Sequence, residues 1–461
     1  MQLQVGKQIS LIFRYLPESA RPDRQLRKDN AILQLFLGIA MRKINALDRQ
    51  RTVYTQGATG QRQIIPFHPD ALAQAAQQRM SPAAWAYIAG GAGLEQTLSA
   101  NASAFDRWRI VPRMLRNVEE RHTAVDFFGH SLPAPFFLAP IGVLEMVHPE
   151  ADLAVARAAR QLGLPYVFSN QASVPMEQCA AAMDSTPRLF QLYWSRSDEL
   201  VVHFLQRAEA AGCSGLVVTL DTTMLGWRTR DLDRGSLPFL QGKGIAQYSS
   251  DPVFRQLMEE PDPNPRPAAR LSWEAIRTLL QANRNFPGSF WNNLRSGAGL
   301  RAVRTFVRLY SRPNITWAEL PFLRKHTRLP IILKGILHPD DARKALDYGV
   351  DGIYVSNHGG RQVDGSIGAL DALPAIAETV RERVPVLIDS GFRGGADAFK
   401  ALALGATAVG IGRPYCYALA INGQAGVEEL LSNWMADFEI TMGLSGCKNL
   451  EEVRRASMVK V

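Results

Sequence analysis

Short apolar runs alternate with amphipathic helical segments from about residue 134 to the C-terminus. We predict eight strands, at 135–139, 165–169, 188–193, 215–221, 329–334, 352–356, 384–389 and 407–412. Helical patterns separate them, as at 150–163, 198–212, 339–349 and 395–405. Strands that are apolar throughout and separated by helices indicate a parallel sheet covered on both faces. Eight such units in succession predict a closed (β/α)₈ barrel of the TIM type.

The spacing of these units breaks once, between the fourth and the fifth strand. The fourth strand ends near Asp221 and the fifth begins near Leu329, which leaves a long stretch between them. Long segments that follow barrel strands are usually lids or oligomer contacts. We therefore expect a lid-like insertion at about 234–316, inside a barrel domain that spans 61–455. Residues 1–60 fall outside the barrel pattern and are expected to form a helical, flexible N-terminal extension.

The composition is that of a soluble globular protein, with 46% hydrophobic and 21% charged residues. The four cysteines are far apart in the chain and form no CxxC pair. This spacing predicts neither a disulfide framework nor a metal site, and it favours a cytoplasmic location.

The formal charge of +9 is concentrated in two segments, because residues 1–55 have a net charge of +6 and residues 251–316 one of +5. No nucleic-acid-binding motif accompanies them, so we expect no nucleic-acid partner. The basic tract at 251–316 fits a solvated surface or a subunit contact as well as a field that steers acidic substrates. The apolar run at 31–41 is too short to cross a bilayer, and no integral membrane segment is expected.

Side chains with useful chemistry follow the predicted strands at their carboxyl ends, where barrel enzymes build their sites. A single buried lysine or histidine could be a satisfied core residue, but the agreement of so many strand ends predicts a functional site. The residues in these positions are Ala139, Pro140, Ser169, Asn170, Gln191, Tyr193, Thr219, Asp221, Lys334, Ser356, His358, Asp389, Gly412 and Arg413.

Glycine-rich loops follow the seventh and eighth strands, with the sequences DSGFRGG (389–395) and GIGRP (410–414). Glycines let backbone N–H groups approach an anion closely, and the guanidinium groups of Arg393 and Arg413 can each bind two phosphate oxygens. These two loops are also the usual phosphate site of this fold. Together they favour a phosphorylated ligand.

The loop SNHGGRQVDG (356–365) joins a potential base to a potential anion clamp. His358 can accept a proton, with Asp221 as the carboxylate that orients its ring. Arg361 can then hold a substrate carboxylate. Lys334 would be costly to bury unless it faced an anion, and the edge of a reduced flavin ring gains negative charge.

These motifs, with YIAGGAGLEQTLSANASAF (87–105), FQLYW (190–194) and TLDTTMLGWRTRDLD (219–233), are similar to those of the FMN-dependent L-2-hydroxy acid oxidase and dehydrogenase family. The resemblance covers about residues 65–455. Within the family, three segments are most similar to those of lactate 2-monooxygenases. They are LGWRTRDLD, SLPFL and the stretch that surrounds SNHGGRQ. The first fifty or so residues match nothing in the family pattern.

The resemblance implies a role for each matching position. His358 would be the active-site base with Asp221 as its partner, and Tyr193 would contact the hydroxyl side of the substrate. Tyr87, Arg228 and Arg361 would bind its carboxylate. The positions that would bind FMN are Ala139, Pro140, Asn170, Gln191, Thr219, Lys334 and Ser356 at the ring, and Asp389, Gly391, Arg393, Gly412 and Arg413 at the ribityl phosphate. Asn170 departs from the small hydroxyl residue that many relatives have.

The reaction implied is oxidation of a small L-2-hydroxy acid such as L-lactate by FMN and oxygen, with oxidative decarboxylation as in lactate 2-monooxygenase. The alternatives are an oxidase that releases hydrogen peroxide, a dehydrogenase with another acceptor, and a non-catalytic flavin-binding protein. Barrels of the inosine-phosphate dehydrogenase or flavin-dependent isomerase type share the phosphate loops, but no cysteine lies at a suitable strand end for the first. The resemblance also implies a homo-oligomer, tetrameric or larger.

Overall fold

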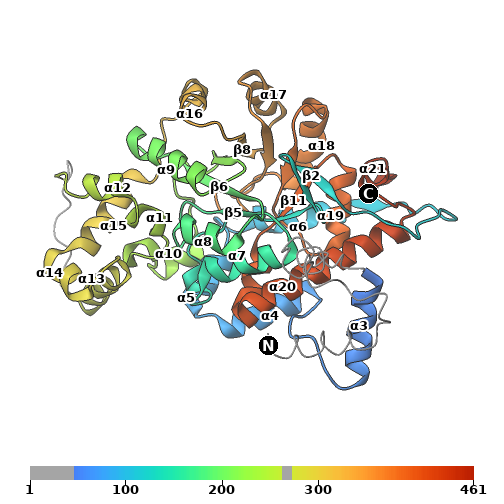
Figure 1. Cartoon of the computed structure of the whole chain (residues 1–461), viewed down its shortest axis with the longest axis horizontal. Coiled ribbons are helices and arrows are strands. Elements are labelled where there is room, and N and C mark those ends of the chain that lie inside the picture. The colour runs from blue at the N-terminus through green and yellow to red at the C-terminus, as the bar shows by residue number, and fades with distance from the viewer. Residues whose placement is uncertain (1–45, 262–271) are drawn as a thin grey trace, which may run out of the picture. The chain divides into compact units, whose positions relative to one another are not determined.

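The computed structural model of the chain describes residues 46–261 and 272–461. Eight parallel strands close into a barrel in the order β10-β11-β4-β5-β6-β7-β8-β9 (Figure 1). Their bounds are β4 Phe136–Leu138, β5 Tyr166–Phe168, β6 Arg188–Tyr193, β7 Leu216–Thr219, β8 Ile331–Ile336, β9 Gly352–Val355, β10 Val386–Ile388 and β11 Ala408–Ile411. All eight lie within or overlap the predicted ranges, so the predicted barrel is confirmed.

The register of the strands sets polar side chains level with one another at the carboxyl edge. Tyr193 of β6 pairs with Thr219 of β7, which pairs with Lys334 of β8. Most other positions of these strands are buried apolar residues, because one face packs inside the barrel and the other packs under helices.

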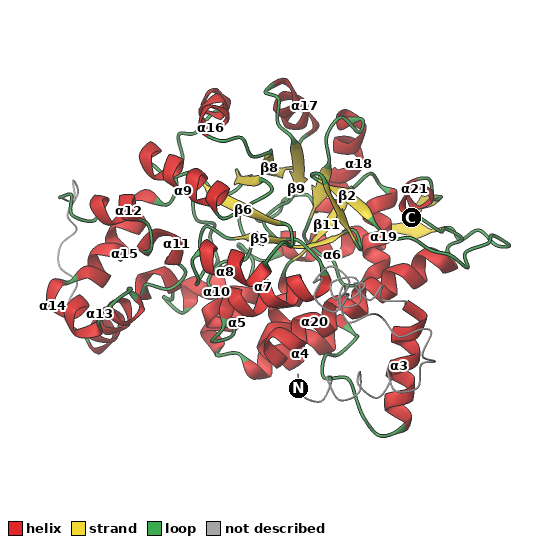
Figure 2. Ribbon diagram, in the orientation of Figure 1, coloured by secondary structure: helices red, strands yellow, loops and turns green. Residues whose placement is uncertain are grey.

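Helices surround the strands on the outside of the barrel (Figure 2). They are α7 Ala151–Leu162, α8 Met176–Met183, α9 Asp198–Ala210, α16 Leu320–His326, α17 Pro339–Asp347, α18 Ala369–Val380, α19 Gly395–Ala403 and α20 Arg413–Leu444, which kinks at Asn422 and Gly423. The four helical patterns predicted from the sequence are all present. Local signals set their ends: Ser197 caps α9 by accepting from the Leu200 N–H, and α7 ends at Gly163 with a positive φ of 66°.

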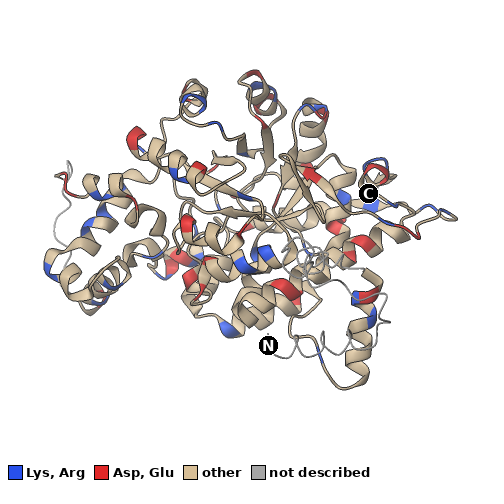
Figure 3. Cartoon of the chain, viewed as in Figure 1, with Lys and Arg blue, Asp and Glu red and all other residues tan. Residues whose placement is uncertain are grey.

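All the regular secondary structure in the described residues of the insertion after β7 is helical. It contains α10 Thr229–Asp233, η4 Pro238–Gln241, α11 Ala246–Ser249, α12 Pro252–Leu257, α13 Trp273–Asn285, α14 Phe290–Ser296, α15 Ala298–Leu309 and η5 Trp317–Glu319. The helices α12–α15 form a lobe beside the barrel (Figure 1). Arginine predominates among the charged residues of these helices (Figure 3). Helix α15 is strongly amphipathic and buries Ala302, Phe306 and Leu309.

The remaining elements pack around the barrel, some at its amino end and others beside the carboxyl ends of the strands. They are α3 Ala46–Ala58, α4 Pro69–Arg79, α5 Pro82–Ala89, α6 Gln96–Asp106, η3 Leu144–Met146, α21 Leu450–Arg454 and the short strands β1 Trp108–Ile110, β2 Val125–Phe127, β3 His130–Leu132 and β12 Met458–Lys460. The β2–β3 hairpin contacts the amino ends of β7 and β9, since His130 lies 2.8 Å from the Ser214 hydroxyl and Phe128 lies against Gly352. This hairpin therefore lies at the amino end of the barrel, away from the carboxyl ends where the site is expected.

The predicted N-terminal extension falls only partly within the described residues. Residues 1–45, with the apolar run at 31–41, lie outside them. Residues 46–461 form one compact unit, in which α3 bonds to α20 through Arg49 Nε and Asn433 Oδ1 at 2.9 Å. The proposed boundary after residue 60 stays a prediction. In the described part of the chain, no helix is both long enough and apolar enough to cross a membrane.

Candidate active site

A cavity with ≈ 940 Å³ of empty space, counted out to its open mouth, lies at the carboxyl ends of the strands. The structure brings thirteen of the predicted residues to its wall: Tyr87, Ala139, Pro140, Gln191, Tyr193, Thr219, Arg228, Lys334, His358, Arg361, Asp389, Gly412 and Arg413.

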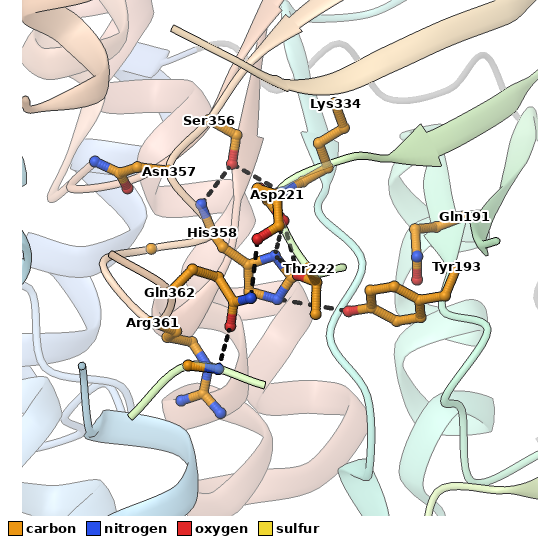
Figure 4. A network of polar contacts seen from close by, with 12 residues as sticks. Gln191, Tyr193, Asp221, Thr222, Lys334, Ser356, Asn357, His358, Arg361 and Gln362 are labelled. Atoms are coloured by element: carbon orange, nitrogen blue, oxygen red, sulfur yellow. Dashed lines mark hydrogen bonds and ion pairs between the residues drawn. The ribbon is translucent and has the colours of Figure 1, made fainter. Parts of the chain in front are cut away.

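The imidazole of His358 is held between a carboxylate and a phenol (Figure 4). Its Nδ1 lies 2.7 Å from Asp221 Oδ1, and its Nε2 lies 3.5 Å from the Tyr193 hydroxyl. A carboxylate only accepts hydrogen bonds, so we assign the ring proton to Nδ1. The lone pair of Nε2 then points to the Tyr193 side, where it can take a proton from a bound molecule.

The backbone of the loop after β9 positions this ring. His358 has a φ of 58°, and its N–H donates to Ser356 Oγ at 3.0 Å. The side chains of Asn101 and Asn357 exchange two hydrogen bonds of 2.8 and 2.7 Å, which tie the loop to α6. A left-handed conformation is unfavourable for a residue other than glycine, and these bonds stabilise it.

Burial and charge keep the two partners in complementary protonation states. Burial lowers the pKa of His358 below its ordinary value, and Asp221 opposes only part of that shift. Burial also opposes the ionisation of Asp221, but its interactions with His358 and Lys334 outweigh burial and hold the pKa of that carboxyl well below its usual range. The result is a neutral imidazole on an ionised carboxylate, which is the arrangement of a general base.

Two guanidinium groups on the cavity wall have no acidic partner within ion-pair distance among the described residues. The Cζ atoms of Arg361 and Arg228 lie 4.9 and 6.0 Å from the centre of the Tyr87 ring. Arg361 Nη1 donates to the carbonyl oxygens of Tyr87 and Gly90. Burial, followed by the like charge of Arg228, lowers the pKa of Arg361 to about 9. A bound carboxylate would offset this repulsion, so the pair is suited to an anionic substrate.

Unpaired polar groups cluster at the ends of β5, β6 and β7. Asn170 Nδ2, Gln191 Nε2 and Thr219 Oγ1 are buried and have no hydrogen-bond partner among the described residues. The ammonium group of Lys334 follows on β8, where it donates to Ser356 Oγ at 2.8 Å. A row of donors beside a cation fits the carbonyl oxygens and the electron-rich edge of a flavin ring. The residues present therefore fit this cofactor.

The predicted phosphate residues divide into two groups. Gly412 and Arg413 line the cavity, and the Arg413 guanidinium is anchored on the carbonyl oxygens of Ile88, Gly359 and Gly90. Arg393 does not line it, because its side chain pairs with Asp106 at 3.1 Å and Asp397 at 3.3 Å.

Three other predicted residues also lie behind the wall. Gly391 packs on the backbone of Asn101 with a φ of 88°, where a Cβ would lie 2.3 Å from a carbonyl oxygen. Ser356 supports Lys334 and also donates to Asp389 Oδ1 at 2.6 Å. Asn170 is completely buried beside Gln191.

Several residues of the site were not predicted from the sequence. Gln362 braces the Arg228 loop, since its Nε2 donates to the carbonyl oxygens of Asp221 and Met224 and its Oε1 accepts from Arg228. Its place in the SNHGGRQ motif was the only signal for it. Leu225, Phe239 and Tyr310 line the cavity from the segment between β7 and β8. Leu225 and Phe239 lie in the motifs LGWRTRDLD and SLPFL, which were their only signal, and Tyr310 lies in no motif.

The barrel and this site define a flavin-dependent oxidoreductase that handles a small anionic substrate. None of the four cysteines, all of which are described, lines the cavity. That excludes a barrel enzyme with a cysteine nucleophile in this pocket.

Comparison with known proteins agrees with this class. Residues 76–460 match the model of the FMN-dependent dehydrogenase family. An L-lactate oxidase of Lysinibacillus sphaericus is 41% identical over 84% of this chain and 92% of its own length. An FMN-dependent alpha-hydroxy acid dehydrogenase of Penicillium citrinum is 39% identical over 91% of this chain and 98% of its own. A solved structure of a mandelate oxidase variant with a C4a-OH-FMN adduct has a TM-score of 0.69 at 34% identity, over 85% of this chain and 99% of that one.

The chain belongs to the FMN-dependent dehydrogenase family. Its cofactor is FMN, and it is an FMN-dependent 2-hydroxy acid oxidoreductase.

Proposed function

We propose that this enzyme oxidises a small L-2-hydroxy acid of the L-lactate type to the 2-keto acid, with oxygen as the electron acceptor. The observation that carries the proposal is the joint placement of a base and a carboxylate clamp on one cavity wall. His358 Nε2 faces Tyr193, while Arg228 and Arg361 lie on the same wall with no acidic partner in the described part of the chain. A 2-hydroxy acid has its hydroxyl group on the carbon next to the carboxylate. The base can therefore contact the hydroxyl side while the two arginines bind the carboxylate.

The residues act in a simple order. Arg228 and Arg361 hold the carboxylate, and the Tyr87 ring keeps both guanidinium groups in place. Tyr193 bonds the substrate hydroxyl, and burial raises the pKa of its phenol, so it stays protonated as a donor. His358 accepts the proton that the substrate loses, and Asp221 stabilises the imidazolium ion.

Bound FMN accepts the two electrons that the substrate loses. The residues that we propose to hold its ring are Ala139, Pro140, Asn170, Gln191, Thr219 and Lys334, with Ser356 behind Lys334. Those for its ribityl phosphate are Asp389, Gly391, Arg393, Gly412 and Arg413. Lys334 is the only cation among the ring residues, and a cation at this edge favours the reduced cofactor.

We further propose that the keto acid stays in the cavity until oxygen has reacted, so that L-lactate and oxygen yield acetate, carbon dioxide and water. Leu225, Phe239 and Tyr310 support this outcome, because these residues of the insertion and its flanking loop line the cavity. Slow opening of such a cover prolongs the life of the enzyme–product complex. The relatives named L-lactate oxidase and 4-hydroxymandelate oxidase favour the alternative, in which the keto acid leaves first and hydrogen peroxide forms.

One experiment separates these outcomes. The purified enzyme should show a flavin spectrum that L-lactate bleaches without oxygen and that D-lactate leaves unchanged. Under air, mainly acetate and carbon dioxide would support the monooxygenase outcome. Stoichiometric pyruvate and hydrogen peroxide would show an oxidase, and slow oxygen use with fast dye reduction a dehydrogenase. Failure of L-lactate, (S)-mandelate and other 2-hydroxy acids to bleach the flavin would refute the proposed function.

A further inference from the structure

Tyr248 in the insertion makes a direct hydrogen bond to a residue beside the flavin site. It lies on α11, is completely buried, and donates from its hydroxyl to Asn170 Oδ1 at 3.0 Å. Asn170 follows β5, 78 positions earlier in the chain. Among the described residues, this hydrogen bond joins the insertion to one of the residues that have an unpaired donor, Asn170.

The orientation of the Asn170 amide is determined by its partners. Its Oδ1 also accepts the backbone N–H of Tyr193 at 3.2 Å. A backbone N–H can only donate, so the atom that faces it must be the amide oxygen. The NH₂ group is therefore directed away from both donors, and Nδ2 has no partner among the described residues.

Gln191 on the neighbouring strand repeats the same pattern. Its Oε1 accepts the backbone N–H of Asn170 at 3.1 Å, and its Nε2 has no partner among the described residues. Gln191 lines the cavity. Two adjacent amides thus have their oxygen ends held by the protein and their NH₂ ends free, as expected of donors kept for an acceptor that is not part of the chain.

The packing of Tyr248 makes its hydroxyl a rigid donor. Its ring lies edge-on to Phe204, Phe254 and Phe306, with centroid distances of 5.1, 5.5 and 4.9 Å. Phe306 in turn stacks on Tyr310, which lines the cavity, at 5.2 Å. The ring cannot turn away without disturbing this cluster, so the hydroxyl stays on Asn170.

We propose that Tyr248 is a positioning residue for the cofactor: it holds the Asn170 amide so that its NH₂ group donates to a carbonyl oxygen of FMN. Two donors on Oδ1 also polarise the amide and strengthen it as a donor. The insertion thereby adjusts the affinity and the reduction potential of the flavin, besides covering the cavity. This inference rests on FMN as the cofactor and not on which acid is oxidised.

The test measures the cofactor itself. Wild-type protein and Tyr248→Phe are stripped of FMN and titrated with it, and the midpoint potential of the bound flavin is measured against reference dyes. The variant keeps the ring and loses only the hydroxyl, so we expect FMN to bind about 3- to 10-fold more weakly. The potential should become more negative, because a donor at this edge stabilises the reduced ring more than the oxidised one.

Tyr166→Phe is the matched control. Tyr166 is also completely buried, and its hydroxyl donates to the side chain of Asp152 at 3.0 Å, which has no contact with the unpaired donors. This variant should leave FMN affinity and potential unchanged. An equal effect of both substitutions would mean that loss of any buried hydroxyl weakens FMN binding, and it would overturn the proposal.

A double-mutant cycle tests the route through Asn170. Tyr248→Phe should have no further effect on the potential in an Asn170→Ala background, and a persisting shift would overturn the proposal. Asn170→Ala by itself gives an independent check if Tyr248→Phe does not fold, since alanine has no donor and a potential equal to that of the wild type would show that the amide donates nothing to FMN. A wild-type protein that binds no FMN would instead refute the proposed function.

Discussion

Replacing Asp221 by asparagine tests the assignment of His358 as the base, because it removes a charge while keeping the size of the side chain. Asp221 Oδ1 lies 2.7 Å from His358 Nδ1 and also accepts from the Thr222 hydroxyl at 2.8 Å. An asparagine amide at this place can donate to Nδ1. That would move the ring proton to Nε2, the atom that must accept the substrate proton.

The size of the effect follows from the geometry. The charge centres of Asp221 and a protonated His358 lie about 4 Å apart, and at an effective dielectric constant of about 20 they attract each other by about 4 kcal/mol. This attraction is present after proton transfer and absent before it. Its loss corresponds to a roughly 10³-fold slower reduction of the flavin.

The assay is anaerobic stopped-flow mixing of the FMN-loaded enzyme with saturating L-lactate. Asp340→Asn is the control, because Asp340 is an exposed carboxylate on α17 that pairs only with nearby surface groups. The control should reduce its flavin at the wild-type rate. Asp221→Asn with FMN fully bound and a reduction rate within about tenfold of the wild type would refute the role given to this pair.

Three further predictions concern the base, the carboxylate clamp and the phosphate site. The value of kcat/KM should fall with decreasing pH only below 6.5, the ordinary pKa of histidine. The reason is that burial lowers the pKa of His358, and a protonated ring cannot accept a proton. A fall in kcat/KM that begins above pH 6.5 would contradict this prediction. Arg361→Lys should raise KM about 10- to 100-fold, because lysine cannot form two parallel bonds to a carboxylate, and an unchanged KM would argue against the clamp. Arg413→Ala should weaken FMN binding about 10- to 100-fold and Arg393→Ala less, because Arg393 is already paired with two acids, and equal losses in a fluorescence titration would exclude this ranking.

The sequence predicted the barrel because its strands are buried on both faces. Such strands are apolar without interruption, as in β7 and β10, and this pattern is local and readable. The polar residues at the carboxyl ends were predictable for a related reason. A barrel interior is filled with side chains, so a lysine that ends a run such as IILK is conspicuous, and strand register then sets Lys334 level with Thr219.

The sequence could not show which partners the side chains of the site would find once the strands had formed a closed barrel. Arg393 follows a barrel strand in a glycine-rich loop, as a phosphate ligand would, yet its guanidinium pairs with Asp106 and Asp397. The same limit applies to Asn170, whose flavin role rests on an amide orientation set by Tyr193 and Tyr248.

The amino-acid sequence by itself determined the eight strands, the place of the insertion and the residue types at the strand ends, because burial and backbone preference act over a few neighbouring residues. The pairing of Asp221 with His358 was expected from the sequence, but only the tertiary structure decided that Oδ1 of the one meets Nδ1 of the other across 137 positions. The tertiary structure also decided that Arg228 and Arg361 lie over Tyr87 with no acidic partner among the described residues. It decided as well that Phe239 and Tyr310 line the cavity from the insertion. These contacts join segments far apart in the chain. Their geometry depends on barrel closure and loop packing, which leave no periodic trace in the sequence.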